Sequence, residues 1–244
     1  MLHLLLPAGT IAALAALRYG IGAVAYNQEN SLEHPIENFK VIERLNHGVE
    51  VRRYPPHTVA VSTIEEPNSM EIGRALGIQE VYKYIQGNNV VQSIWGKTTG
   101  KNITMHFTTP VETTVHGFDE RRGKAPSAVS VAVIMGSEYH KAHHPTPMGN
   151  VRIRHVPARY LAVQSFHGQI PSRKVVQRRR NAIVESLRHS PYSQKFVPQK
   201  ETVLLGYHDP VLVPGVIRKN EVGVVLEQDQ TELIRVLTTP YGVI

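Results

Sequence analysis

The sequence predicts an α+β fold built from two similar halves. The first observation is an internal repeat: VEVRRYPPHTVAVSTI at residues 49–64 returns about a hundred residues later as VRIRHVPARYLAVQSF at residues 151–166. Second, each copy alternates apolar and polar residues, passes a proline-marked turn and enters a β-branched run, which is the pattern of a hairpin. Third, a helical pattern and further apolar runs follow each copy. We therefore expect a duplicated β-α-β-β unit with a pseudo-two-fold axis.

The two copies agree along the whole repeat, and we expect Pro55 and Pro157 at equivalent turns. A second echo supports the first, because residues 109–111, TPV, follow copy one at nearly the spacing by which residues 209–211, DPV, follow copy two. The alternative is chance similarity between two β-rich hairpins. The identical pairs are Val49/Val151, Arg52/Arg154, Pro55/Pro157, Ala60/Ala162 and Val61/Val163, and the conservative pairs are Val51/Ile153, Val59/Leu161 and Thr63/Ser165.

Composition limits the class of protein without naming it. The 244 residues are 41% hydrophobic and 19% charged, which is ordinary for a globular chain and long enough for one pseudo-symmetric domain. The absence of cysteine excludes a disulfide framework, a thiolate metal site and a cysteine nucleophile. A formal charge of +7 favours anionic partners such as lipid head groups, acidic proteins, nucleic acid or a carboxylated ligand, and charge alone does not choose among them.

Residues 1–26 form an apolar N-terminal segment. Between residues 4 and 26, Arg18 is the one charged residue. Roughly 20 apolar residues suffice to cross a bilayer, so a hydrophobic helix retained as a membrane anchor is expected. The alternative is a cleaved targeting peptide, because Ala23-Val24-Ala25 resembles a small-residue cleavage site. Residues 27–38 are polar and contain Pro35, so they are expected to form a linker before a folded domain at residues 39–228.

In the first half, residues 69–87 predict an amphipathic helix with Ser69 as N-cap and Gly87 as its end. Gly73 and Gly77 weaken it by about 1 kcal/mol each, so close packing must compensate. Residues 88–102, with Trp95, are expected to form a loop insertion. Residues 103–115 and 128–135 are expected to be strands joined by a basic turn at residues 119–124. The apolar helix face is predicted at Ile78, Val81, Tyr82 and Ile85.

In the second half, residues 172–190 predict another helix, strongly basic on its outer side. Residues 202–206 and 221–227 are expected to be strands, and residues 229–244 a tail with moderate β character. Two such halves predict a sheet of about eight strands with two helices on one side. The apolar face of this helix is expected at Val176, Ile183 and Leu187, and its basic residues are Arg173, Lys174, Arg178, Arg179, Arg180 and Arg188.

No motif points to an enzyme, since the chain has no glycine-rich phosphate loop, HExxH, nucleophile elbow or helical pair of carboxylates. We expect no catalytic residues and no metal site, because His140, His143 and His144 lie in a proline-rich loop with only Glu138 nearby. Residues 178–180, RRR, could hold phosphates, but no interleaved aromatics are present to stack on bases, so a solvated helix face or contact with acidic protein or lipid is favoured over nucleic acid.

Six short stretches of the sequence, in the same order along the chain, resemble the SOUL haem-binding protein family over roughly residues 49–227. The resemblance implies a distorted β-barrel or sheet with two helices from a β-α-β-β duplication. It also implies non-enzymatic binding of haem or another tetrapyrrole in a shallow apolar cleft beside the first helix. The pieces are VEVRRY at 49–54, KYIQGNN at 83–89, ITM at 103–105 with TPV at 109–111, PTP at 145–147, SFHG at 165–168, and GY at 206–207 with RKNEV at 218–222.

The resemblance has gaps at the expected site. A histidine proposed as haem ligand in one branch of the family corresponds to Arg53, which cannot coordinate iron. Another branch of the family binds through apolar contacts and through basic residues near the propionates. Of those basic residues, Lys83 is retained in this chain. The arginine of the first helix is replaced by Ala75, beside Arg74, and a lysine just before a proline late in the sequence is replaced by Val213. Family members commonly have a tryptophan after Asn, Glu and a hydrophobic residue, and the corresponding residue here is Gly223. The expected tetrapyrrole site, weak and without an axial histidine from the first hairpin, is Arg74, Ile78, Val81, Tyr82 and Lys83.

Two functions from different classes follow. The first is a membrane-anchored carrier or buffer of haem or another tetrapyrrole, with membrane lipid as partner. The second is an accessory structural subunit of a larger organellar membrane complex, in which haem binding is weak or lost. The basic domain and apolar N-terminal segment favour an organellar membrane, the mitochondrial inner membrane before a plastid membrane. Nucleic acid is not an expected partner.

Overall fold

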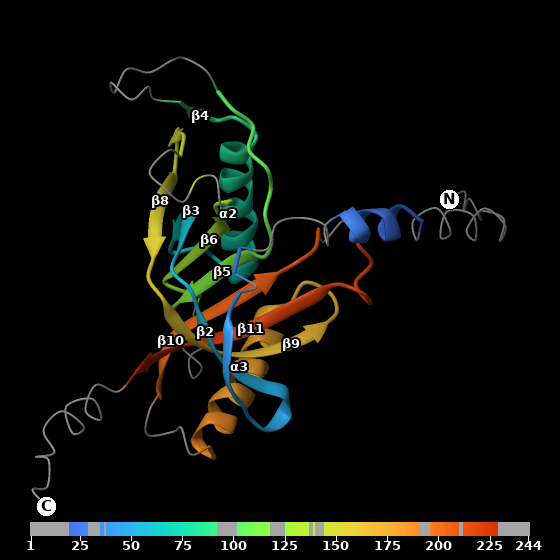
Figure 1. Ribbon diagram of the computed structural model, residues 1–244, viewed down its shortest axis with the longest axis vertical. Helices are drawn as coiled ribbons and strands as arrows, with labels where there is room; N and C mark the ends of the chain where they lie inside the picture. Colours follow the sequence, from blue (N-terminus) through green and yellow to red (C-terminus); the bar gives the residue numbers. More distant parts are fainter. Residues whose placement is uncertain are drawn as a thin grey trace, which may run out of the picture.

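The computed structural model describes residues 20–28, 35–36, 38–91, 102–117, 125–136, 139, 144–190, 196–209 and 212–228. These form helices packed on a large antiparallel sheet, which confirms the predicted α+β class (Figure 1). The elements are β1 Lys40–Arg44, η1 Asn46–Gly48, β2 Val49–Tyr54, β3 His57–Glu65, α2 Met70–Ile85, β4 Asn89–Val90, β5 Val111–His116, β6 Ala128–Ile134, β7 Thr146–Pro147, β8 Val151–Val156, β9 Arg159–His167, α3 Arg173–Arg188, β10 Phe196–Gly206 and β11 Lys219–Gln228.

The strand order confirms the duplication. The nine-stranded sheet runs β1-β2-β9-β11-β10-β5-β6-β3-β8. When β1 is left out, the remaining eight strands are arranged symmetrically about the centre of the sheet. The equivalent pairs, from the edges inward, are β2 and β8, β9 and β3, β11 and β6, and β10 and β5. The register repeats as well: Val49 pairs with Gln164, and the corresponding Val151 pairs with Ser62. The central pair, β5 and β10, therefore lies at the pseudo-two-fold axis.

The predicted hairpins are wrong, although their strands exist. β2 pairs with β9 and β3 pairs with β8, so each repeat places its two strands toward opposite ends of the sheet. A two-residue hairpin needs residues with positive φ, whereas proline is held near −65°. Pro55, Pro56 and Pro157 occupy the short links, and none of these links contains a residue with positive φ. The prolines bend the chain without reversing it.

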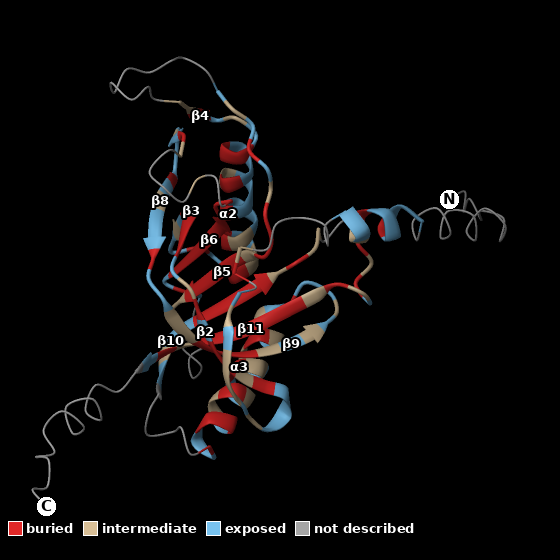
Figure 2. Cartoon of the chain, viewed as in Figure 1, coloured by how far each residue is buried: buried red, intermediate tan, exposed pale blue. Residues whose placement is uncertain are grey.

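The sheet is strongly curved but is not a closed barrel, which corrects the expected barrel. Among the described strands, β1 and β8 each have one paired neighbour and form its edges. One apolar cluster joins side chains from β3 and β6 with side chains from β9 and β10. Since β3 and β9 lie toward opposite ends of the sheet, its concave face must bring the two ends together. Figure 2 shows the buried residues along these strands.

Both helices cover the opposite, convex face, as predicted. Alternate strand residues point there: Ala60 and Val133 pack under α2, while Ala162 and Val222 pack under α3. α2 contacts β6 and β3, and α3 contacts β11 and β9. Each half of the duplication thus supplies one helix to the same side of the sheet.

The boundaries of α2 match their sequence signals. Ser69 caps the helix by accepting the backbone N–H of Ile72 at 3.2 Å, and Gly87 follows its end with φ of +108°. The predicted apolar face is half wrong. Val81 and Ile85 are buried, but Ile78 and Tyr82 are exposed, because the helix turns Gly73 and Gly77 toward the sheet instead.

The two glycines allow α2 to lie unusually close to β6. A Cβ atom at Gly73 would lie 2.9 Å from Cβ of Val129, and one at Gly77 would lie 2.6 Å from Cγ2 of Val131. This close packing compensates for the poor helix propensity of glycine, as predicted.

α3 buries Val176, Ile183 and Leu187 as predicted, and Ser172 is its N-cap residue without a side-chain capping bond. Its arginine run is not a solvated face throughout. Arg180 is buried and donates to the Gln199 carbonyl at 2.7 Å. Arg179 lies 3.7 Å over the ring of Phe166. Arg178 alone of these three arginines is exposed, so the run serves mainly to attach α3 to the sheet.

Other predictions need smaller corrections. The strand expected at residues 103–115 begins only at Val111, and the one expected at 202–206 is the end of the longer β10. The strand at 221–227 lies within β11. The echo of TPV by DPV is coincidental, since residues 109–110 precede β5 whereas residue 209 follows β10, the equivalent strand.

Part of the N-terminal segment and several predicted loops lie outside the described residues. Residues 20–28 are helical. No helix among the described residues is long and apolar enough to cross a membrane. Residues 1–19, most of the linker, the loop around Trp95, the turn at 119–124, His140, His143 and the tail at 229–244 are not described. The membrane segment and the domain boundaries therefore stay predictions.

Candidate functional site

A cavity of about 550 Å³ lies beside α2 on the convex face of the sheet. Its floor is the apolar surface of the central strands, from β5, β6 and β10. The segments before β5, before α3 and after β10 complete the wall. A cavity of this size that is mostly apolar and has few polar groups is the usual form of a small-molecule site. The lining includes Val111, Thr113, Val131, Val133, Leu204, Phe107, Thr109, Ile170, Pro171, His208 and Asp209.

The structure brings together most of the residues proposed from sequence. Arg74, Ile78, Val81 and Tyr82 all line the cavity. Lys83 is not among the lining residues; its ammonium group pairs with Glu80 at 2.8 Å on the outer side of α2. Whether the four lining residues bind a tetrapyrrole stays a prediction.

Arg74 is the cationic side chain among the lining residues. Its Nη1 donates to the Pro171 carbonyl at 3.4 Å, while the carboxylate of Glu71 accepts the backbone N–H of Arg173 at 2.9 Å. These two contacts hold the N-termini of α2 and α3 together. Burial lowers the pKa of Arg74, and the charge of Glu71 opposes that effect. A guanidinium stays protonated in proteins, so Arg74 presents a positive charge to the cavity.

His208 lines the cavity but is poorly arranged to bind iron. Its Nδ1 accepts the backbone N–H of Lys219 at 3.2 Å, so the neutral ring carries its proton on Nε2. Neither nitrogen then offers a free lone pair. Arg53, at the position of the proposed family ligand, is exposed and is not among the lining residues. The described part of the cavity therefore offers no axial nitrogen.

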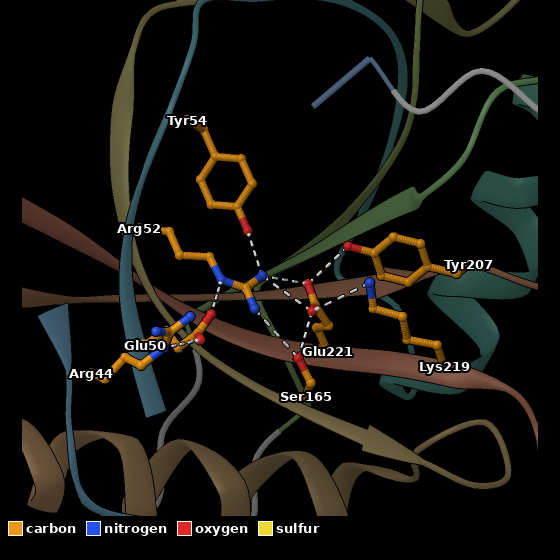
Figure 3. A network of polar contacts seen from close by, with 8 residues as sticks. All are labelled: Arg44, Glu50, Arg52, Tyr54, Ser165, Tyr207, Lys219 and Glu221. Carbon is orange, nitrogen blue, oxygen red and sulfur yellow. Dashed lines mark hydrogen bonds and ion pairs between the residues drawn. The ribbon is translucent and has the colours of Figure 1, made fainter. Parts of the chain in front are cut away.

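Beneath this region a buried polar cluster crosses the concave face (Figure 3). The Glu221 carboxylate accepts from Arg52 Nη1 at 3.1 Å, from Ser165 Oγ at 2.6 Å and from Tyr207 Oη at 2.9 Å. Arg52 also donates to Tyr54 at 3.2 Å. With a charge partner and hydrogen bonds, the carboxylate can be almost completely buried.

The ionisation of this cluster follows from burial. Desolvation, reinforced by the charge of Glu221, raises the pKa of Tyr54 to about 12. Desolvation and the same carboxylate also raise the pKa of Tyr207. Burial raises the pKa of Glu50, but hydrogen bonds from Arg44 and Arg52 outweigh it and leave that pKa below its ordinary value. At neutral pH both tyrosines stay protonated and act as donors or acceptors without charge.

Most of the sequence pieces that carried the family resemblance meet in such polar contacts, and two of them also reach the cavity, because Gly206, Asn220 and Glu221 are among its lining residues. The piece at 49–54 supplies Arg52 and Tyr54, the pieces at 206–207 and 218–222 supply Tyr207 and Glu221, and the piece at 165–168 supplies Ser165. These pieces thus connect strands from both halves of the fold.

A second set of pieces meets at the C-terminal end of α2. Asn89 donates to the carbonyls of Tyr84 at 2.9 Å and Ile103 at 2.8 Å, and Tyr84 donates to the Pro145 carbonyl at 2.9 Å. The family signature therefore marks the scaffold together with part of the cavity wall, at Thr109, Val111, Gly206, Asn220 and Glu221.

Sequence reasoning missed the residues that close the cavity on the side away from α2. Ile170 and Pro171 precede the α3 cap, and His208 and Asp209 follow β10. A weak signal was present, because His208 and Asp209 directly follow the family piece GY. No cluster of metal-ligating side chains occurs among the residues that the structure describes.

Comparisons with solved structures give only distant similarities. The EcmrR C-terminal domain aligns with a TM-score of 0.46 and 10% identity over 78% of this chain and 98% of that chain. A hydrolase encoded by lin2189 from Listeria innocua aligns with a TM-score of 0.45 and 11% identity over 73% and 91%. SAV2435 bound to tetraphenylphosphonium aligns with a TM-score of 0.40 and 11% identity over 75% and 96%. Scores this low give no basis for an inference about function.

The sequence comparison is decisive where the structures are not. No protein of curated function matches this chain in sequence. Residues 35–225, however, match the family described as SOUL heme-binding protein, and this range includes β1 to β10, most of β11, both long helices and the cavity. The chain belongs to the SOUL heme-binding protein family.

Proposed function

We propose that this protein is a non-enzymatic carrier or buffer that binds haem or another tetrapyrrole in the cavity beside α2. The observation that carries the proposal is an apolar cavity of about 550 Å³ containing one lining arginine, in a chain of a haem-binding family. A porphyrin has apolar faces and carries carboxylates at one edge. The cavity offers an apolar surface to the faces and the guanidinium group of Arg74 to the carboxylates.

The division of roles follows the lining. Ile78, Val81 and Tyr82 of α2 contact the ring, and Arg74 pairs with a propionate. Burying a ring face against aliphatic side chains supplies most of the affinity, at about 25 cal/mol per Å² of apolar area. A partly exposed ion pair adds on the order of 0 to 1 kcal/mol, so Arg74 mainly orients the ring. With Lys83 engaged by Glu80 and no axial nitrogen, modest affinity is expected.

The proposal includes attachment to an organellar membrane by residues 1–26, the mitochondrial inner membrane before a plastid membrane. The apolar composition of residues 4–26, with Arg18 as its one charged residue, and the net charge of +7 support it. If the full-length chain is extracted from membranes by alkaline carbonate or high salt, the anchor is wrong.

Titration of the full-length protein in detergent with haem, and separately with iron-free protoporphyrin, tests the binding. Similar modest affinities for the two compounds are expected, because the ring and its carboxylates are recognised and iron is not. A low-spin haem spectrum that disappears on replacing one histidine would falsify binding without an axial ligand.

A colourless protein that binds neither compound and comigrates with a large assembly on native gels would support the alternative function. In that case the chain is an accessory subunit of a membrane complex, and the fold serves as a scaffold. The polar contacts among the family pieces also support that role, since they connect strands from both halves of the fold.

A further inference from the structure

An exposed apolar surface surrounds the helical residues 20–28. Val24 is 58% exposed and Val216 is 72% exposed, and Ile21 and Leu212 are about half exposed. Gly22 lies against the segment that carries two of these residues, where an added Cβ would be 2.5 Å from Cδ of Pro214. We call Ile21, Val24, Leu212 and Val216 the apolar collar. Figure 1 shows this helical segment beside the connection between β10 and β11.

The collar is attached directly to the cavity wall. The ring of Tyr26 stacks on His208 with ring centroids 4.8 Å apart and planes inclined by 12°. Asp209 accepts the backbone N–H of Leu212 at 2.8 Å through its side chain. Both His208 and Asp209 line the cavity. One layer of residues therefore separates the collar from the site.

The cavity also has an apolar rim. Ile78, Tyr82 and Ile170 line it and are each more than two-fifths exposed. Large aliphatic and aromatic side chains exposed together mark an interaction surface, whereas single ones need no explanation. Here the rim and the collar are joined through His208 and Asp209.

We propose that the collar lies in the surface of a lipid bilayer and that the cavity exchanges its ligand directly with that bilayer. The inference rests on the proposed function for the existence of a ligand and adds the route by which it enters. The sequence before the collar favours lipid as the occupant, because residues 4–19 are apolar with one charge, at Arg18, and lead directly into the helix that carries Ile21 and Val24. An apolar ring with carboxylates partitions into the same interface.

Site-specific labelling tests the contact with lipid. Because the chain has no cysteine, Val216→Cys creates a unique site for an environment-sensitive fluorophore in the full-length protein. Val197→Cys, at a valine that is 48% exposed on β10, is the matched control. In phosphatidylcholine vesicles containing nitroxide-labelled acyl chains, the label at Val216 should be quenched and the label at Val197 should not. Position 216 is the informative one, because it lies outside the N-terminal segment. A label at Val24 would be quenched even if only residues 1–26 entered the bilayer.

Transfer kinetics test the route. Val216→Asp should slow transfer of haem from phosphatidylcholine vesicles to the protein at least tenfold and leave the affinity for haem added in water unchanged. Val197→Asp should change neither. Equal transfer rates for the two variants would overturn the route, as would a label at Val216 shielded only by a second copy of the chain. If the unmodified protein takes up haem from neither source, the proposed function fails and the route with it, while the label still decides whether the collar contacts lipid.

Discussion

α2 and α3 occupy equivalent places in the two halves, yet the cavity lies beside α2. Aligned from their caps, Ser69 and Ser172, the sheet-facing Gly73 and Gly77 of α2 correspond to Val176 and Arg180 of α3. α2 therefore lies close against the sheet, whereas α3 is held through the buried Arg180 side chain.

The outer faces of the two helices differ in the same way. Ile78 and Tyr82, which line the cavity, correspond to Asn181 and Glu185, which are polar and exposed. The difference shows that duplication preserved the strand order, while a few helix positions determined which half has a binding cavity.

The largest effect is expected at the buried Arg52–Glu221 ion pair, which joins the two halves and involves Arg52 but not the symmetry-related Arg154. Arg52→Met should cost about 3–5 kcal/mol of unfolding free energy, because the Glu221 carboxylate is left buried without its main partner. The symmetry-related Arg154 is exposed, so Arg154→Met should change stability by less than about 0.5 kcal/mol. Urea denaturation measures both. Equal costs for the two variants would show that the halves do not differ here.

Alkaline pH should destabilise the same end of the sheet. Since the pKa of Tyr54 is raised from 10.0 to about 12, the unfolded chain releases this proton first as pH rises. The associated stability is present below pH 10 and is lost as pH rises toward 12, by about 2–3 kcal/mol at about 1.4 kcal/mol per pKa unit. The equivalent position, Val156, cannot titrate. Stability measured from pH 9 to 12 should fall less steeply in Tyr54→Phe, and an unchanged slope would rule out Tyr54 as the cause.

The close approach of α2 is tested by Gly77→Ala. Alanine raises helix propensity by about 1 kcal/mol, but its Cβ would lie 2.6 Å from Cγ2 of the buried Val131. Overpacking should win, with a net loss of about 1–2 kcal/mol in thermal or urea unfolding. Gly20→Ala is the control, because an added Cβ there meets nothing within 4 Å. A stabilised Gly77→Ala variant would mean that the helix moves away from the sheet without cost.

The smallest effect is expected when the outer face of α2 is given the residues of α3. The double variant Ile78→Asn and Tyr82→Glu should weaken haem binding about tenfold, equivalent to about 1.4 kcal/mol, and leave stability nearly unchanged. Ile72→Asn is the control, since Ile72 is similarly exposed on α2 but is not among the lining residues. Loss of affinity in the control alone would move the site to another part of α2.

Local sequence signals predicted most elements but not all their contacts. Ser69 and Gly87 marked the ends of α2 because capping depends on neighbours along the chain. Period-3.6 spacing placed Ile78 and Tyr82 on the buried face, which was wrong, since glycine carries no hydrophobic signal although Gly73 and Gly77 face the sheet. Arg180 was missed in the same way, because burial of an arginine depends on carbonyls that β10 supplies.

The sequence by itself determined the duplication, the order of strands and helices, the family and the helix that borders the cavity. These properties depend on residue patterns within short segments, which favour one local structure without reference to residues far away in the chain. Only the tertiary structure decided that β2 pairs with β9, that Glu221 meets Arg52, and that His208 and Asp209 close the cavity. The physical reason is that pairing, burial and charge compensation depend on residues far apart in the chain, which only the curvature of the sheet brings within contact distance.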